Sequence, residues 1–547
     1  MAALRTKQQD PKVVNLLADL LERSAEEKRK REVELAKGQD TRSWGAQKHS
    51  TNAAWLLFAF QVVLIFLFAT LATGAQGSQS NDNMSVSQLK GNQGSNTQAY
   101  NMFIGVEIMM FVGFGYLMTF LKWYGLGAVG FTLLVTAIGL QWSLFTESFF
   151  SQAMNEAYSW HEVHINMYSL LNALYSISSV LITFGAIIGK ISPLQLVIVT
   201  IIELVCHSVN YKVLMASLNL ADMGGTYIDH MFGAYFGLTI AWILGKPKTE
   251  PSMGTVPDVF SLIGTVFLWI YWPSFVAGAA VADSDQQGRA LVNTILALSS
   301  STVCTFWLSS VLGSTAVFRP VDIQNATLAG GVAIGCTANL NMSPFGAIMI
   351  GCAAGMVSTL GYNSVQPWLE ARLGLHDTCG IHNLHAMPSV VGALASVILA
   401  GYKDNNGNRD STIYVYSVAD TGVMWWSQFV AIFVCIAFAV STGAITGLIL
   451  KLVQPAENDS WKEFHDDQWW SVGDDYNQTF YSELGAIIQN AGPDSEWTAH
   501  KGPQPQQKNK LAELDTSWHH GRRTPILTQG ISLPTVAEGD IEVSVKA

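Results

Sequence analysis

Twelve apolar stretches, separated by short polar segments, follow one another along this chain. The first covers residues 53–75, and a helix needs about 20 apolar residues to cross the hydrocarbon core of a bilayer. The other eleven cover residues 101–121, 125–146, 164–188, 194–214, 221–245, 258–281, 290–312, 323–341, 344–365, 380–401 and 422–452. The pattern predicts an all-α polytopic membrane protein with twelve transmembrane helices, of which the last eleven form one domain over residues 101–453.

The composition agrees with a membrane protein and disfavours several other classes. Of the 547 residues, 49% are apolar and 13% are charged, whereas soluble domains carry about 25% charged residues. The net charge is −11, and the Lys and Arg residues near the N-terminus do not imply a nucleic-acid-binding patch, so nucleic acid is not an expected partner. The six cysteines lie in or beside apolar stretches without the close paired spacing of a zinc site. We therefore interpret them as packing residues and expect no metal or other cofactor.

The charge of the N-terminal segment sets the predicted orientation. Residues 1–52 are rich in Lys and Arg, which favour the cytoplasmic side of a membrane helix, and an even number of helices returns the C-terminus to that side. We therefore expect a multi-pass plasma-membrane protein with both termini in the cytoplasm. Asp10 and Pro11 mark the start of a predicted amphipathic helix within this segment; a solvated leader is the alternative interpretation.

Two further polar segments flank the eleven-helix domain. Residues 76–100 form an expected extracellular loop, which contains Asn83 in an Asn-Met-Ser glycosylation sequon. Residues 454–547 contain no further apolar stretch, and this composition predicts a largely disordered cytoplasmic tail. The tail begins with an acidic and aromatic patch at residues 465–470, and we expect this first part to dock on the membrane domain.

One apolar stretch is unusual because it carries three ionisable residues, Asp222, Asp229 and His230. Ionisable side chains are costly in hydrocarbon and usually face a pore, a partner or water. Asp222 and His230 are eight residues apart, so on a helix they lie about 12 Å apart along the axis and about 80° apart around it, and both can line one passage. His382 and His385 begin another apolar stretch, and one of them is expected to face His230.

Seven segments, in chain order, resemble the Rh glycoprotein branch of the ammonium transporter superfamily. The resemblance covers residues 100–452 and is carried by the motifs Phe111–Gly115, Gly139–Trp142, Phe184–Pro193, Asp222–Leu238, Trp269–Phe275, Ile323–Gly331 and Asp377–His385. It implies a homotrimer in which each subunit encloses its own pore of eleven helices, with one extra N-terminal helix. It also implies a channel-like transporter rather than an enzyme.

The resemblance assigns roles to particular residues. Members of this family draw ammonia from ammonium at the pore mouth and pass it through an aromatic gate and then past two hydrogen-bonded histidines. The matching histidines are His230 and His385, whereas His382 does not match. Phe275 matches one gate position, and Tyr175 occupies the other, where the family usually has phenylalanine.

Acidic residues complete the pore that the resemblance implies. Asp222 is expected to cap backbone groups near the outer mouth and to favour cations there. Asp258 and Glu370 match acidic positions of the cytoplasmic approaches. The physics agrees with this scheme, because moving a charged ammonium ion into a dry lumen costs far more than moving neutral ammonia. Two facing imidazoles share one proton and offer a polar surface without a fixed charge.

The sequence departs from the family pattern at several positions. Asp229 stands where relatives usually carry an apolar residue, and we expect it to face a neighbouring helix and to have a partner other than Glu107. Tyr211 occupies a position near the outer mouth where the Rh branch often has glutamate. His207 is expected to be a packed or vestibule residue. Ala386 and Ser389 replace family glycines.

Other interpretations stay open at this point. The two histidines can be unrelated core residues bonded to backbone carbonyls, and the conducted molecule can be carbon dioxide. A membrane metalloenzyme would use the cluster His376, Cys379, His382 and His385, which lacks a His-Glu-x-x-His arrangement. A sensor or scaffold would use the long C-terminal tail.

Overall fold

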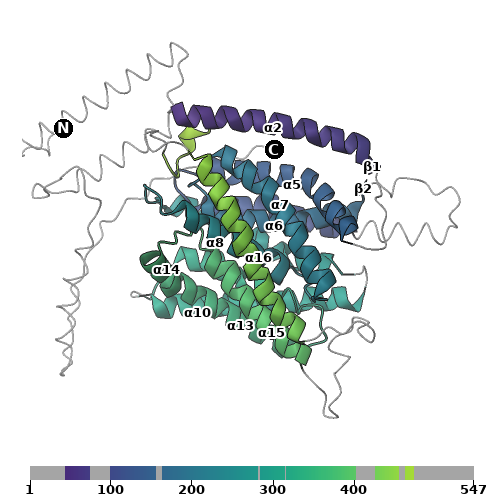
Figure 1. The fold of residues 1–547 in the computed structure, drawn as a ribbon. Helices are drawn as coiled ribbons and strands as arrows, with labels where there is room; N and C mark the ends of the chain where they lie inside the picture. The colour runs from purple at the N-terminus through teal and green to yellow at the C-terminus, as the bar shows by residue number, and fades with distance from the viewer. Residues whose placement is uncertain are drawn as a thin grey trace, which may run out of the picture. The chain divides into compact units, whose positions relative to one another are not determined.

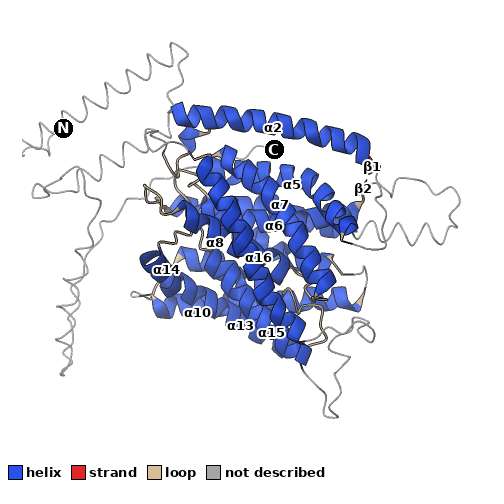
Figure 2. Cartoon of the chain, viewed as in Figure 1, coloured by secondary structure: helices blue, strands red, loops and turns tan. Residues whose placement is uncertain are grey.

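The described part of the chain is almost wholly helical (Figure 2). The computed structural model describes residues 44–73, 99–154, 163–280, 284–313, 316–401, 425–454 and 462–473. Within these ranges the strands are two residues long, and β1 (Ala72–Thr73) pairs in parallel with β2 (Val163–His164). The predicted N-terminal amphipathic helix, Asn83 and the tail beyond residue 473 lie outside the described residues.

The helices follow the apolar stretches closely, as the hydropathy pattern predicts. Up to the middle of the chain they are α2 (Trp44–Leu71), η1 (Met109–Phe114), α4 (Gly115–Leu117), η2 (Met118–Phe120), α5 (Gly125–Ala153), α6 (Met167–Ile187), α7 (Pro193–Lys212), η3 (Val213–Ser217), η4 (Thr226–Met231) and α8 (Phe232–Leu244). Then come α9 (Thr255–Gly278), α10 (Asp285–Leu312), α11 (Pro320–Asn325), η5 (Ala326–Leu328), α12 (Ala329–Ile334), α13 (Pro344–Leu360), η6 (Gly361–Val365), α14 (Gln366–Leu373), η7 (His382–Ala386), α15 (Met387–Gly401), α16 (Trp425–Leu452) and η8 (Asp466–Gln468).

Ten helical stretches of the described residues are long and apolar enough to cross a membrane, which confirms the all-α membrane fold. The other two predicted stretches, 221–245 and 323–341, also form helices. One is η4 with α8, which begins only at Thr226, and the other is α11, η5 and α12, which is broken by a 3-10 turn. Both are shorter than their apolar stretches, because each gives residues to loops that carry polar groups.

The two ends of the helix bundle differ in what they hold. The end that contains the last turn of α5 and the start of α6 encloses a cavity, and we name it the cavity end. The opposite end binds residues 462–473, and we name it the tail end. Successive long helices alternate in direction between these ends, as short connections between neighbouring helices require.

The first helix, α2, lies along the outside of the bundle beside α5 and α7 (Figure 1). Near its start, the His49 ring bonds the Ser192 hydroxyl through Nδ1 at 2.9 Å. Halfway along, the Gln61 amide donates to the Gln141 amide oxygen at 2.8 Å. Such bonds between side chains hold membrane helices together, because lipid offers no alternative partner. These contacts attach the extra helix at more than one depth.

The helices α6 and α8 form the tightly packed centre of the bundle. A Cβ atom at Gly233 would lie 2.6 Å from the Ser179 carbonyl oxygen, and one at Gly237 would lie 2.7 Å from Thr183 Cα. Only glycine permits this approach of two backbones, and small residues at such contacts are typical of membrane helices. Large apolar side chains such as Trp307 are instead exposed on the bundle surface.

The first part of the C-terminal tail docks on the tail end, which confirms that expectation. The Asp466 carboxylate accepts hydrogen bonds from the backbone N–H groups of Leu126 and Gly127, at 2.8 and 2.7 Å. These groups belong to the first turn of α5, where N–H groups lack a helical partner. Phe464 donates its own N–H to the Gly189 carbonyl at 3.0 Å, and Trp470 packs against Phe131 with ring centroids 5.3 Å apart.

Candidate functional site

Two histidine side chains from different helices meet inside the bundle. His230 lies on η4 and His385 on η7, and Nδ1 of the first lies 3.2 Å from Nδ1 of the second. The rings are stacked, with centroids 5.2 Å apart and an interplanar angle of 17°, and both side chains are buried. His382 does not take part in this contact, and its ring lies beside the Asn383 side chain.

One short sequence pattern precedes both histidines. The spacing Asp-x-x-Gly-x-x-x-x-His occurs twice, as Asp222, Gly225 and His230 and as Asp377, Gly380 and His385. Both glycines adopt a positive φ, +69° and +72° respectively, which glycine reaches without the steric cost that other residues meet. Each glycine lets the chain turn into a π-helical segment, and such segments are frequent at functional sites.

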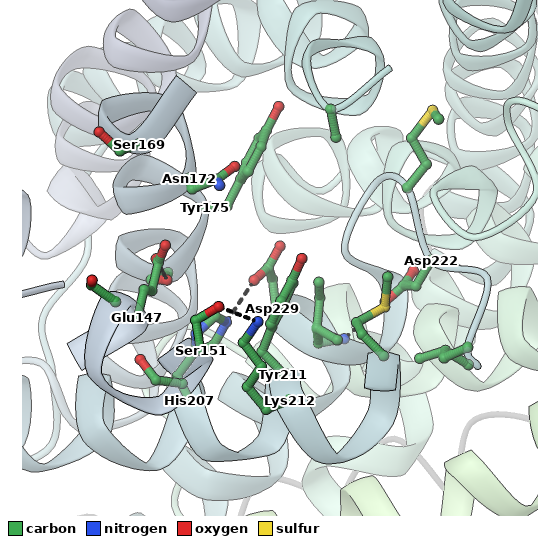
Figure 3. A pocket seen from close by; sticks show the side chains of 18 of the residues that line it. Glu147, Ser151, Ser169, Asn172, Tyr175, His207, Tyr211, Lys212, Asp222 and Asp229 are labelled. Atoms are coloured by element: carbon green, nitrogen blue, oxygen red, sulfur yellow. Dashed lines mark hydrogen bonds and ion pairs between the residues drawn. The ribbon is translucent and has the colours of Figure 1, made fainter. Parts of the chain in front are cut away.

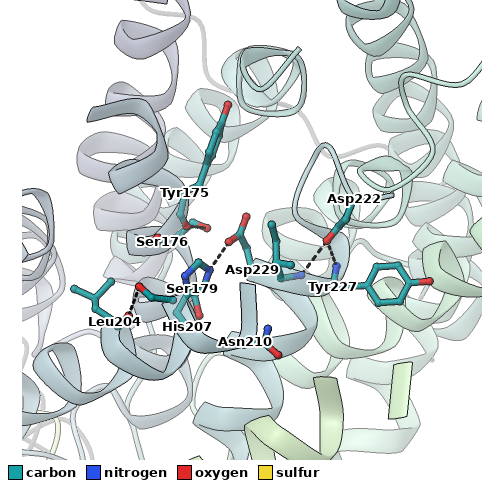
Figure 4. Close-up of polar contacts among 12 residues, drawn as sticks. Tyr175, Ser176, Ser179, Leu204, His207, Asn210, Asp222, Tyr227 and Asp229 are labelled. Carbon is teal, nitrogen blue, oxygen red and sulfur yellow. Dashed lines mark hydrogen bonds and ion pairs between the residues drawn. The ribbon is translucent and has the colours of Figure 1, made fainter. Parts of the chain in front are cut away.

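The aspartate of each copy caps the helix that carries the histidine. Asp222 Oδ2 accepts hydrogen bonds from the backbone N–H groups of Tyr227 and Ile228, at 2.8 and 2.9 Å (Figure 4). Asp377 accepts three such bonds, at 2.9–3.1 Å, from Gly380, Ile381 and His382. The sequence analysis predicted the cap for Asp222 but overlooked Asp377. The repeated spacing was the signal that identifies it.

The aromatic side chains Tyr175 and Phe275 lie next to the histidine pair. Their rings meet edge to face with centroids 4.9 Å apart, and the Phe275 ring lies 5.9 Å from the ring of His230. Trp272, one turn before Phe275 on α9, stacks on His230 with ring centroids 5.6 Å apart. The structure thus brings together all four residues that the sequence analysis placed at the gate and the twin histidines.

A cavity of about 570 Å³ opens at the cavity end, beside Tyr175 (Figure 3). Its wall contains Asp229, whose Oδ1 lies 2.8 Å from His207 Nε2. Both side chains are buried, so His207 is the partner that the sequence analysis required for Asp229 without naming it. The two residues lie 22 positions apart on different helices, and no sequence spacing pairs them.

A second carboxylate of the cavity was overlooked in the sequence. Glu147, on the last part of α5, accepts a hydrogen bond from the Ser176 hydroxyl at 2.5 Å and lines the cavity with Tyr211 and Lys212. In the sequence, Glu147 is marked only by being an acidic residue at the end of an apolar stretch. Glu147 therefore places a carboxyl group on the same cavity wall as Tyr211.

The two predicted acids of the opposite approach lie at the tail end. Asp258 Oδ1 accepts a hydrogen bond from the Gln324 amide at 3.0 Å, and Glu370 lies 3.9 Å from Lys246 Nζ. A buried lysine, Lys190, donates to the His376 carbonyl at 2.6 Å. Burial lowers the pKa of Lys190 to about 8. The approach on this side therefore mixes both signs of charge.

The cluster suggested for a metalloenzyme does not assemble. In the ranges covered by the structure, no three His, Cys, Asp or Glu side chains converge as metal ligands do. Cys379 is a free thiol, and the His385 ring is engaged with His230. The site is therefore a hydrogen-bonded histidine pair below two aromatic rings, with carboxylates on the wall of the adjoining cavity.

Comparison with known proteins shows the family. The sequence model of the Ammonium Transporter Family matches residues 54–471. The chain belongs to this family. Among its relatives, the zebrafish (Danio rerio) protein named ammonium transporter Rh type C-like 2 is 38% identical over 437 residues, which cover 76% of this chain and 88% of that protein. An Rh type C ammonium transporter of Gasterosteus aculeatus is 41% identical over 69% of this chain and 78% of its own length.

Two solved structures have a fold similar to that of this chain. Nitrosomonas europaea Rh50, of the Rhesus protein family of channels, matches with a TM-score of 0.60 and 28% sequence identity, over 73% of this chain and all of that chain. Saccharomyces cerevisiae Mep2 matches with a TM-score of 0.53 over 74% of this chain and 93% of that chain. Its sequence identity is 16%, so this second likeness concerns the fold alone.

Proposed function

We propose that this family member is a channel-like transporter that conducts ammonia, drawn from ammonium, across the plasma membrane. The proposed route begins in the cavity, passes between the rings of Tyr175 and Phe275, and leads to the pair His230 and His385. The single observation that carries the proposal is the 3.2 Å contact between the two Nδ1 atoms, because it joins two buried polar rings from two different helices.

The hydrogen bond between the rings defines what the pair offers to a passing molecule. A bond between two Nδ1 atoms needs a proton on one of them and a lone pair on the other. With both rings neutral, one Nε2 is therefore an acceptor and the other carries a proton. The pair offers a donor and an acceptor without a fixed positive charge, which suits ammonia, a molecule that both donates and accepts.

The carboxylates of the cavity favour cations before the gate. Glu147, Asp222 and Asp229 all line the cavity, and they raise the local concentration of ammonium by electrostatic attraction. Beyond the gate the charged form loses its water, which costs far more than the dehydration of neutral ammonia. Deprotonation before the gate is therefore the favoured course, with the proton passing to water in the cavity. We assign the tail-end acids Asp258 and Glu370 to the gathering or release of ammonium on the other side.

The remaining features of the proposal follow the family. We infer a homotrimer with one passage in each subunit, no enzymatic activity and no cofactor. Both termini are assigned to the cytoplasm, so the cavity end is extracellular and Asn83 is the glycosylation site. The exposed apolar side chains of α10 and α13, among them Trp307 and Phe345, supply surface for lipid and for neighbouring subunits.

Stopped-flow pH recording on liposomes that contain the purified protein tests the proposal. An inward ammonium and ammonia gradient is expected to alkalinise these liposomes faster than empty ones. The double variant His230→Ala/His385→Ala is expected to change this rate, and His382→Ala, one turn from the pair, serves as the matched control. Well-inserted protein that gives no acceleration would contradict ammonia conduction, and equal effects of the His230 and His382 variants would contradict the residue assignment.

A further inference from the structure

The hydroxyl group of Tyr175 has no hydrogen-bond partner among the described residues, although its oxygen is buried. The ring forms the edge-to-face contact with Phe275, and the same side chain lines the cavity. Buried hydroxyl groups in proteins are nearly always hydrogen-bonded. A hydroxyl without a protein partner, at the boundary between a cavity and the histidine pair, indicates that a small polar molecule is its partner.

The residue opposite this hydroxyl leaves room for it. Gly278 is the last residue of α9, three positions after Phe275. A Cβ atom at Gly278 would lie 2.5 Å from the Tyr175 oxygen and 3.3 Å from Leu171 Cδ2. The first distance is too short for any real contact, so the side chain at 278 must be absent for the hydroxyl to sit where it does.

Two further buried polar atoms beyond the gate have no partner among the described residues, His230 Nε2 and Trp272 Nε1. The Phe275 ring contacts both the Tyr175 ring and the His230 ring, and Trp272 stacks on His230. The Tyr175 hydroxyl is therefore the first of three unpaired polar atoms that lead from the cavity toward the histidine pair. The gate therefore contains a polar group, the Tyr175 hydroxyl, as well as two aromatic rings.

We propose that the Tyr175 hydroxyl is a hydrogen-bonding group of the gate that binds a small molecule with N–H or O–H groups, either ammonium or water. The role in transport rests on the function proposed above. As ammonium loses water at the gate, the hydroxyl oxygen accepts one of its N–H groups. Once the ammonium has released its proton to water in the cavity, the hydroxyl donates to the nitrogen lone pair of ammonia instead. A phenylalanine gate offers neither bond.

The variant Tyr175→Phe removes this one oxygen and tests the proposal. Ammonium-driven alkalinisation and osmotic shrinkage are recorded by stopped flow on the same batch of proteoliposomes. Alkalinisation is expected to be about tenfold slower than in the wild type, which corresponds to the loss of one hydrogen bond of about 1.4 kcal/mol. A decrease of alkalinisation alone identifies ammonium as the molecule bound, and a parallel decrease of water permeability identifies water as well. Unchanged rates in both recordings would overturn the proposal.

Two further variants separate the hydroxyl from general effects on the fold. Tyr168→Phe removes a hydroxyl from an exposed residue two turns earlier on α6 and is expected to keep the wild-type rates. Gly278→Ala is expected to slow the wild type, because the added Cβ displaces the hydroxyl, but to add little in the Tyr175→Phe background, where the oxygen is gone. An equal slowing in both backgrounds would overturn the placement of the hydroxyl. A wild type no faster than empty liposomes would instead count against conduction itself.

Discussion

Replacement of Asp377 by Ala removes the carboxylate that caps the helix of His385. Asp377 is buried and accepts three backbone N–H bonds, so its removal leaves these N–H groups without their acceptor. Loss of a single helix cap costs about 0.5–2 kcal/mol, and each hydrogen bond to a charged group contributes about 1.5–3 kcal/mol. Three such bonds together contribute about 4.5–9 kcal/mol. A cost of about 3 kcal/mol lies between this range and that of a single cap, and it corresponds to about a hundredfold decrease in the population with His385 in place.

The assay is ammonium-driven alkalinisation of proteoliposomes, with the same substitutions at both copies of the repeated pattern. Asp377→Ala is expected to lower the rate almost to that of empty liposomes, and Asp222→Ala is expected to do the same through His230. The amide oxygen of Asn still accepts a hydrogen bond, so Asp377→Asn and Asp222→Asn are expected to have smaller effects. Asp285→Ala, at an exposed position at the start of α10, is the control. A wild-type rate for Asp377→Ala would refute the reasoning.

Two other predictions concern buried charges. His207→Phe leaves the Asp229 carboxylate buried without its partner, which costs about 3–5 kcal/mol. The double variant His207→Phe/Asp229→Leu replaces both partners by apolar groups and is therefore expected to unfold at a higher temperature than the single variant. A lower unfolding temperature for the double variant would contradict the pairing. Lys190 has a pKa of about 8 in the folded protein against an ordinary value of about 10.4. The free-energy cost of burying its charge is therefore complete below pH 8 and decreases as the pH rises from 8 toward 10.4. The unfolding temperature of the wild type is therefore expected to rise relative to that of Lys190→Met between pH 8 and 10, and a constant difference would contradict the burial effect.

The helix positions could be predicted from the sequence because the bilayer imposes a length on every apolar stretch. The stretch 125–146 becomes α5 (Gly125–Ala153), and 258–281 becomes α9 (Thr255–Gly278). The ends differ by several residues where polar side chains extend a helix beyond the hydrocarbon, as at the end of α5. The stretch 221–245 begins as a loop instead, because the Asp222 cap and the positive φ of Gly225 delay the helix to Thr226.

The partners across helices could not be predicted in the same way. Asp229 and His207 meet because α7 and η4 pack with one particular rotation, which depends on close contacts elsewhere in the bundle and not on local sequence. Glu147 and Ser176 meet for the same reason, on α5 and α6. The contact between His230 and His385 was predicted from the family resemblance. A resemblance carries information about packing that one sequence does not contain.

The two copies of the repeated pattern share a fold but differ in charge. All carboxylate oxygens of Asp377 are used by backbone N–H groups, and the nearby Lys190 adds a positive charge on that side. Asp222 uses only Oδ2 for its cap, and its Oδ1 is buried without a partner among the described residues. Glu147 and Asp229 line the same cavity as Asp222, so three carboxyl groups are gathered at the cavity end. The same backbone device therefore holds both histidines, while its surroundings differ: in the function proposed above, the carboxylates of the cavity attract ammonium, and the half-exposed acids Asp258 and Glu370 lie on the other side.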